Sequence, residues 1–184
     1  MLEALGVHAV GFVFAPSRRR VTPEEAAGIA AALGPMVARV GVFVDAPPEE
    51  VLEVAEAARL TALQLHGDEP PQVARRLGRR YPVIKAFRVR GAPDPAIFRY
   101  PADALLLDGP RPGSGTAFDW GWLASVPAGA RVVVAGGLAP ENVCGLLQRF
   151  RPYAVDVSSG VEARPGVKDR DRVRAFLRTV EGCG

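Results

Sequence analysis

The sequence predicts an α/β protein built as a TIM (β/α)8-type parallel barrel. Short apolar runs alternate with amphipathic helical stretches and start roughly 20–30 residues apart, the size of one strand–helix unit. Most runs are apolar throughout, which is typical of parallel strands covered on both faces. Glycine-rich turns come late in the chain, whereas an open doubly wound sheet places its glycine fingerprint after the first strand. Late glycines favour a barrel.

The apolar runs define the expected strands. The chain has about seven such runs, whereas a complete (β/α)8 barrel has eight strands. We therefore expect the first strand of the barrel to be missing. The expected strands are Ala9–Phe14, Ala38–Val44, Ala62–Leu65, Val83–Phe87, Ala104–Leu107, Arg131–Ala135 and Ala154–Val157.

Helix starts are marked between these runs. Thr22 followed by Pro23 and two Glu residues predicts an N-cap, a proline at the first helical position and an acidic first turn. Similar signals occur at Pro47-Pro48, Pro70-Pro71, Ala139–Asn142 and Asp169, and the chain opens in what resembles a helix over Met1–Gly6. Only a short helix is expected between Val89 and Tyr100. No shift in composition marks a linker, which predicts a single domain over residues 1–184.

The bulk composition restricts the class of function. With 48% hydrophobic and 23% charged residues, no run approaching the ~20 apolar residues of a membrane span and no basic leader, the chain is expected to be soluble and cytoplasmic. The net charge of +3 comes mostly from dispersed arginines, which suits a small anionic ligand and argues against nucleic acid. Cys144 and Cys183 form no metal-binding spacing and no disulfide framework, so we expect structural or incidental thiols.

In a barrel the residues that follow each strand form the ligand-facing rim. Asp108 ends the Leu105–Leu107 run; it either caps a loop or acts as a general acid, and we favour the acid. His66-Gly67 ends the third run, where the ring is either structural or able to donate a hydrogen bond. The Arg18–Arg20 run is either a solvated charge run or supplies one arginine to a carboxylate. The Pro112–Thr116 loop suits closure over a ligand.

Two glycine-bearing turns predict a phosphate site. Gly136 and Gly137 follow the sixth run, and glycines there let backbone N–H groups approach an anion, unless they serve only a tight turn. Ser158, Ser159 and Gly160 follow the last run. If the two turns lie side by side, hydroxyl and amide protons would hold a phosphate without a lysine.

These segments resemble the phosphoribosylanthranilate isomerase family, and the resemblance extends from Met1 to the C-terminus. The resembling segments are GFVFAPSRRRV, QLHGDEPP, VIKAF, ALLLDG, PGSGTAFDW, AGGLAPENV, AVDVSSGVE and PGVKD. The resemblance implies a sugar-phosphate-binding barrel that isomerises N-(5'-phosphoribosyl)anthranilate by an Amadori rearrangement, a step of tryptophan biosynthesis, without metal or cofactor.

The resemblance also implies roles for individual residues. Asp108 would be the general acid that opens the furanose ring, and Arg19 would hold the anthranilate carboxylate, with Arg18 in place of the proline of the family's Ser-Pro-Arg segment. His66 and Asp156 would line the substrate site. The phosphate loops would comprise Gly136, Gly137, Ser159 and Gly160.

The family's general base is a cysteine in a first strand of the type Lys-Ile-Cys-Gly-Ile-Thr, which has no match in this sequence. Without that base the chain is expected to turn over more slowly by about 10²–10⁴-fold. An incomplete barrel also leaves unpaired strand edges, so the chain is expected to be either a monomer or a homodimer. Two alternatives stay open: a non-catalytic sugar-phosphate binder that has lost its base, and a related barrel acting on another phosphorylated substrate.

Overall fold

The computed structural model describes residues 1–109 and 120–183, so the loop Pro112–Thr116 expected to close over a ligand lies outside the described residues. The chain divides into two compact units, which we describe separately. Unit 1 comprises Met1–Ala86 with Pro101–Asp103, and unit 2 comprises Phe87–Tyr100 with Ala104–Gly184.

Unit 1 contains a parallel sheet whose strands pair in chain order. Its strands are β1 (Ala9–Val13), β2 (Ala38–Phe43), β3 (Ala62–Leu65) and β4 (Val83–Arg88), of which β4 belongs to this unit as far as Ala86. All of β3 is buried, as expected for a parallel strand covered on both faces.

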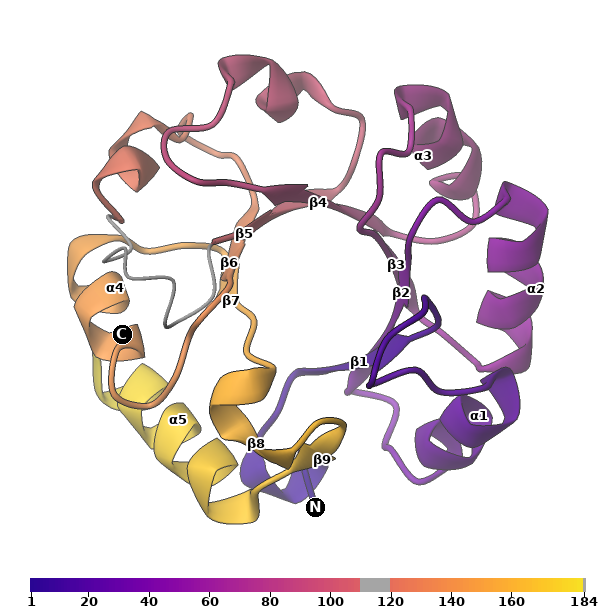
Figure 1. The fold of residues 1–184 in the computed structure, drawn as a ribbon, viewed down its shortest axis with the longest axis horizontal. Coiled ribbons are helices and arrows are strands. Elements are labelled where there is room, and N and C mark those ends of the chain that lie inside the picture. Colours follow the sequence, from indigo (N-terminus) through magenta and orange to yellow (C-terminus); the bar gives the residue numbers. More distant parts are fainter. Residues whose placement is uncertain (110–119, 184) are drawn as a thin grey trace. The chain divides into compact units, whose positions relative to one another are not determined.

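The helices of unit 1 lie on the outer side of these strands (Figure 1). They are η1 (Glu3–Leu5), α1 (Pro23–Ala31), α2 (Pro48–Ala57) and α3 (Pro71–Leu77). The predicted start of α1 is confirmed by a capping box, in which the Thr22 hydroxyl accepts from the Glu25 N–H and the Glu25 carboxylate accepts from the Thr22 N–H. The largest fully buried side chains of this unit are Val51, Leu63, Leu65, Leu77 and Val83.

Unit 2 contains a second run of parallel strands in chain order. They are β5 (Ala104–Asp108), β6 (Val132–Ala135) and β7 (Ala154–Val155). The helical segments are η2 (Pro95–Arg99), η3 (Trp120–Ser125), α4 (Val143–Arg149), η4 (Ser159–Val161) and α5 (Arg170–Cys183). The fully buried core side chains are Leu106, Leu107, Val134, Val143 and Leu146, each stabilising the fold by roughly 1.5–3 kcal/mol.

The predicted strands and helix starts are confirmed with small shifts at their ends. The last predicted strand is shorter than expected, since β7 ends at Val155. The short helices η3 and η4 were not predicted, and neither were β8 (Glu162–Arg164) and β9 (Val167–Lys168), which form an antiparallel hairpin after η4. Strands this short, with mixed polar and apolar residues, show no readable periodicity. None of the described helices combines the length and apolar character needed to cross a bilayer.

The expectation of unpaired thiols was wrong, because Cys144 of α4 and Cys183 of α5 form a disulfide. Their Cα atoms lie 5.5 Å apart although 39 positions separate them in sequence. Helices α4 and α5 pack side by side (Figure 1). The buried residues of α5 are Val173 and Phe176. This packing, not any local cysteine spacing, brings the two sulfur atoms together.

We expect the disulfide to contribute substantially to stability. Cross-linking positions 39 residues apart restricts the unfolded chain, which the loop-closure account values at roughly 3–4 kcal/mol. The double variant Cys144→Ser/Cys183→Ser should therefore unfold at lower urea concentration than the oxidised protein. Adding a reductant should lower the midpoint of the wild-type protein and leave that of the double variant unchanged. Equal midpoints for oxidised and reduced wild type would contradict the prediction.

Candidate active site

In unit 2 the end of β5 lies against the turn that follows β6. The Gly109 N–H donates to the Ala135 carbonyl over 3.0 Å, continuing the strand pairing to the point where both strands end. Gly136 adopts a φ of 87°, and a Cβ placed there would overlap Gly109 and lie 2.8 Å from Oδ1 of Asp108. A side chain at position 136 would therefore displace the Asp108 carboxyl group.

The Gly136-Gly137 turn is held by Asn142. Both glycines have positive φ, the left-handed region that disfavours other residues. The Asn142 side chain donates to the Gly137 carbonyl over 2.8 Å and accepts from the Ala139 N–H over 2.9 Å. One amide side chain at the end of the loop between β6 and α4 thus bonds two backbone groups of that loop.

The second glycine-bearing turn lies directly against the first. The Asp156 N–H donates to the Val134 carbonyl, which carries the chain from β7 to the same end of the strands. A Cβ on Gly160 would overlap the Leu138 carbonyl oxygen and lie 3.0 Å from Cα of Ala139. The prediction that the two turns lie side by side is confirmed. Ser158 and Ser159 are exposed at this surface, while Gly160 is partly buried.

The structure therefore brings together six of the predicted site residues within unit 2. They are Asp108, Gly136, Gly137, Asp156, Ser159 and Gly160. Asp108 is half-buried and Asp156 is exposed. Chemically, the arrangement places a carboxyl group beside backbone turns of the kind that bind oxyanions.

The other two predicted residues belong to unit 1. Arg19 follows β1 and is partly buried, and its N–H donates to the Ser17 hydroxyl over 3.0 Å. His66 follows β3, where its N–H donates to the Phe43 carbonyl and its Nδ1 lies 3.0 Å from Nε2 of Gln64. Because an amide NH2 group can only donate, this contact makes Nδ1 the acceptor and places the proton of the neutral ring on Nε2.

A buried ion pair that sequence reasoning missed supports the His66 loop. Lys85 of β4 and Glu69 each keep only 3% of the side chain exposed, and their Nζ and Oε2 atoms lie 3.0 Å apart. Lys85 also donates to the Gly67 and Ala86 carbonyls over 2.6 and 3.1 Å. The available signal in the sequence was a single lysine inside the apolar run Val83–Phe87. A charged side chain is buried in a strand only when it is paired, so this lysine called for a buried acidic partner.

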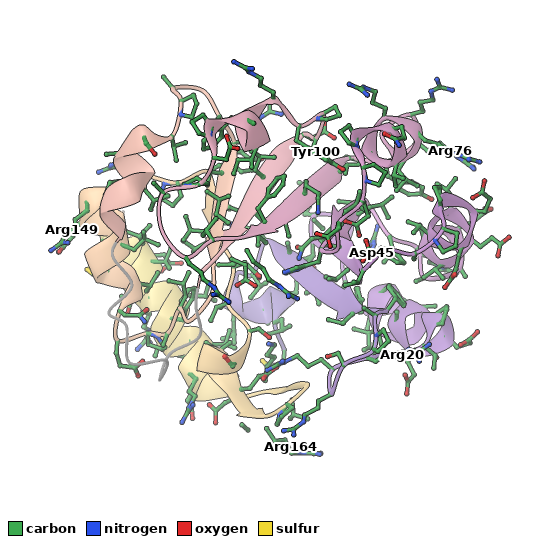
Figure 2. The ribbon with its side chains drawn as sticks, turned by 45° about the horizontal axis from the view of Figure 1, so that its top comes forward. Arg20, Asp45, Arg76, Tyr100, Arg149 and Arg164 are labelled. Carbon is green, nitrogen blue, oxygen red and sulfur yellow. A yellow bond between two sulfur atoms is a disulfide. The ribbon has the colours of Figure 1, made fainter. Side chains whose placement is uncertain are left out.

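The Glu69 carboxylate ties the loops after β2 and β3 together. It accepts from the Asp45 N–H over 3.0 Å and from the Gly67 N–H over 3.0 Å. Asp45, labelled in Figure 2, accepts in turn from the Asp68 N–H over 2.7 Å. Burial raises the pKa of Glu69, but the hydrogen bonds from the Asp45 backbone and from Lys85 outweigh burial and hold its pKa below the ordinary value.

A pocket of about 260 Å³ lies in unit 2 just past β4. Val89, which lines the pocket, donates its N–H to the Asp108 backbone carbonyl over 3.0 Å. Arg88 and Arg90 line the pocket with Phe87, whose ring packs edge-on against Tyr100. The short helix predicted between Val89 and Tyr100 is confirmed as η2, but sequence reasoning found no site in this segment, although Arg88 at the end of β4 and Arg90 just after it were the available signal. Across the described residues no group of three His, Cys, Asp or Glu side chains could hold a metal ion.

Parallel strands in chain order, with helices between them and polar residues at one end of the strands, define a (β/α)-barrel type of protein. The sequence model of the family described as N-(5'phosphoribosyl)anthranilate (PRA) isomerase matches residues 2–179. The chain belongs to this family.

Individual relatives agree with the family assignment. N-(5'-phosphoribosyl)anthranilate isomerase from Geobacter sulfurreducens is 48% identical over 96% of this chain and 89% of its own length. The crystal structure of phosphoribosyl anthranilate isomerase from Thermus thermophilus is 55% identical, with a TM-score of 0.90 over 99% of this chain and 92% of that chain. A family structure in complex with reduced 1-(o-carboxyphenylamino)-1-deoxyribulose 5-phosphate is 43% identical, with a TM-score of 0.90 over 98% of this chain and 90% of that chain.

The buried pair predicts an acid-sensitive contribution to stability. Because the pKa of Glu69 in the folded protein is below its ordinary value of 4.5, its stabilisation is present above that value and is lost as the pH falls through the lowered pKa. In urea unfolding at a series of pH values, Glu69→Gln should be less stable than wild type at pH 7, by about 3–5 kcal/mol, because Lys85 keeps its charge without a buried partner. The difference should shrink as the pH falls below 4.5 and through the lowered pKa of Glu69.

The double variant Glu69→Leu/Lys85→Met serves as the control, since removing both charges leaves no unpaired ion. It should recover much of the stability that Glu69→Gln loses. A Glu69→Gln protein as stable as wild type at pH 7 would show that the pair contributes little.

Proposed function

We propose that the chain catalyses the isomerisation of N-(5'-phosphoribosyl)anthranilate to 1-(2-carboxyphenylamino)-1-deoxyribulose 5-phosphate, a step of tryptophan biosynthesis that uses neither metal nor cofactor. The observation that carries the proposal is the contact between the Asp108 carboxyl group and Gly136, next to the turn that contains Gly160. The proposed reaction is the one after which the family of this chain is described.

The phosphate of the substrate is proposed to bind at the two adjacent turns. Gly136 and Gly137 leave their backbone uncovered by side chains, and Ser159 and Gly160 approach from the neighbouring turn. Backbone N–H groups in such a concave arrangement bind phosphate oxygens without a lysine. The phosphate would thus anchor the sugar with its ring beside Asp108.

Asp108 is proposed to act as the general acid. Its carboxyl group gives a proton to the furanose ring oxygen as the bond from that oxygen to C1 breaks, and the nitrogen lone pair forms a C=N bond to C1. Loss of the proton on C2 then gives the enolamine, which tautomerises to the ketone product. Asp108 ends β5 beside the Gly136 turn, so its carboxyl group lies next to the place where the phosphate of the substrate is proposed to bind.

The base for the C2 proton is not assigned to a residue of this chain. A thiolate of Cys144 or Cys183 is ruled out as that base in the oxidised protein, because both sulfurs are joined in the disulfide. A binder without catalysis therefore stays the second candidate, and it predicts phosphate binding without turnover.

Arg19, His66 and Asp156 are proposed to bind the rest of the substrate. The Arg19 guanidinium is suited to a bidentate contact with the anthranilate carboxylate. The His66 ring with its proton on Nε2 can donate to a sugar hydroxyl, and the Asp156 carboxylate can accept from one.

We further propose that residues 1–184 form one sugar-phosphate-binding domain, that the protein acts in the cytoplasm, and that it is a monomer or a homodimer. The match of the family model to residues 2–179, which spans both units, supports the single domain.

For the acid, Asp108→Asn should lower kcat by about 10²–10⁴-fold, because an amide cannot give up a proton to the ring oxygen. The KM for phosphoribosylanthranilate should change much less, since the amide fills the same volume. Steady-state turnover of the purified protein tests this. Unchanged kcat would remove Asp108 from the mechanism, and a wild-type protein that binds phosphate without turnover would favour the binder.

For the carboxylate contact, Arg19→Ala should raise KM by about 10–100-fold through loss of a charged hydrogen bond, with a smaller effect on kcat. The neighbouring exposed residue provides the matched control, and Arg18→Ala should leave KM near that of wild type. The opposite pattern, with KM raised only by Arg18→Ala, would transfer the role to Arg18.

A further inference from the structure

The hairpin β8–β9 connects the proposed phosphate turn to α5. It follows η4 directly, and its strands pair Glu162 with Lys168. The Asp169 N–H donates to the Val161 carbonyl over 2.8 Å, which closes the segment into a loop whose ends meet behind the turn. The function proposed above assigns no role to this hairpin.

Lys168 reaches from β9 onto the backbone of the turn. Its Nζ atom donates to the Ser158 carbonyl over 3.1 Å and to Oε1 of Glu162 over 3.2 Å. Glu162 has only 5% of its side chain exposed and also accepts from the Gly166 N–H over 3.2 Å. The ammonium group is therefore held at a set position by a buried carboxylate, and from there it holds the Ser158 carbonyl.

The geometry of the peptide bond transmits this constraint to the phosphate side. In a planar trans peptide the carbonyl of one residue and the N–H of the next point in opposite directions. Fixing the Ser158 carbonyl toward Lys168 therefore directs the Ser159 N–H away from the lysine. A cation on the carbonyl also polarises the peptide group and strengthens its N–H as a donor.

We propose that Lys168 is a positioning residue that sets phosphate affinity by holding the Ser158–Ser159 peptide group, with Glu162 fixing the lysine. This inference rests on the proposed function, because it assumes that phosphate binds at the Ser159–Gly160 turn. Since Glu162 neutralises the lysine at short range, orientation of the peptide group and not long-range attraction is the main effect.

The test combines binding of inorganic phosphate with kinetics. Lys168→Met keeps the length and apolar stem of the side chain but removes the ammonium donor, leaving the Ser158 carbonyl with the Val161 N–H at 3.3 Å. We expect it to weaken phosphate binding in calorimetry, and to raise KM, by about 10-fold or more, the value of a charged hydrogen bond. The kcat should stay within about threefold of wild type, since the Asp108 chemistry is untouched. Lys168→Arg should retain most of the affinity, because a guanidinium can still donate to the carbonyl.

The matched control is Arg164→Met in the same hairpin. Arg164 is exposed and extends away from the ribbon (Figure 2), so its loss should leave phosphate affinity unchanged. An equal loss of phosphate affinity in Lys168→Met and Arg164→Met would show that general surface charge attracts the phosphate, and it would overturn the proposal. Folding of each variant is checked by its urea midpoint, and Lys168→Gln replaces Lys168→Met if the latter does not fold.

The two proposals fail in different ways. A folded Lys168 variant with wild-type phosphate affinity overturns this inference, whatever the activity of the protein. A wild-type protein that binds phosphate but does not turn over phosphoribosylanthranilate contradicts the proposed function, while the phosphate measurements still decide the role of Lys168. Absence of phosphate binding in wild type would overturn both the phosphate site and the inference built on it.

Discussion

The site in unit 2 depends on close backbone contact at positions where no side chain fits. Gly136 lies against Gly109 and the Asp108 carboxyl group, and Gly160 lies against the Leu138 carbonyl. A single Cβ at either position would separate the elements by more than a hydrogen bond can span. Because positions 136 and 160 are glycines, the backbones of β5, β6 and the turn after β7 can lie close together.

Polar side chains hold the loops around this contact in a fixed shape. Asn142 bonds the backbone of Gly137 and Ala139 in the loop after β6, and Lys168 bonds the carbonyl of Ser158 in the turn after β7. In unit 1 the Lys85–Glu69 pair does the same for the loops after β2 and β3. In each case side-chain hydrogen bonds anchor the backbone of a loop at the site, which reduces the entropy lost when a ligand binds.

The disulfide extends this anchoring to the outer layer of unit 2. It joins α4, which follows the Gly136-Gly137 turn, to α5, which follows the hairpin that carries Lys168. The two loops proposed to bind phosphate are thus linked both by backbone contact and, through their following helices, by a covalent bond. Disulfides are rare in cytosolic proteins of mesophiles and common in those of hyperthermophiles. The single asparagine and the proline-rich loops of this chain are consistent with a heat-tolerant protein.

Much of the fold was determined by local sequence. Apolar runs such as Leu105–Leu107 are typical of parallel strands buried on both faces, and Thr22 and Glu25 cap the start of their own helix without help from distant residues. Paired glycines likewise showed where backbone must approach backbone. Only the tertiary structure decided the disulfide, the Lys85–Glu69 pair, the β8–β9 hairpin and the contact of Lys168 with Ser158. These pairs form because separate elements pack together, and no spacing along the chain encodes which helix faces or strand ends will meet.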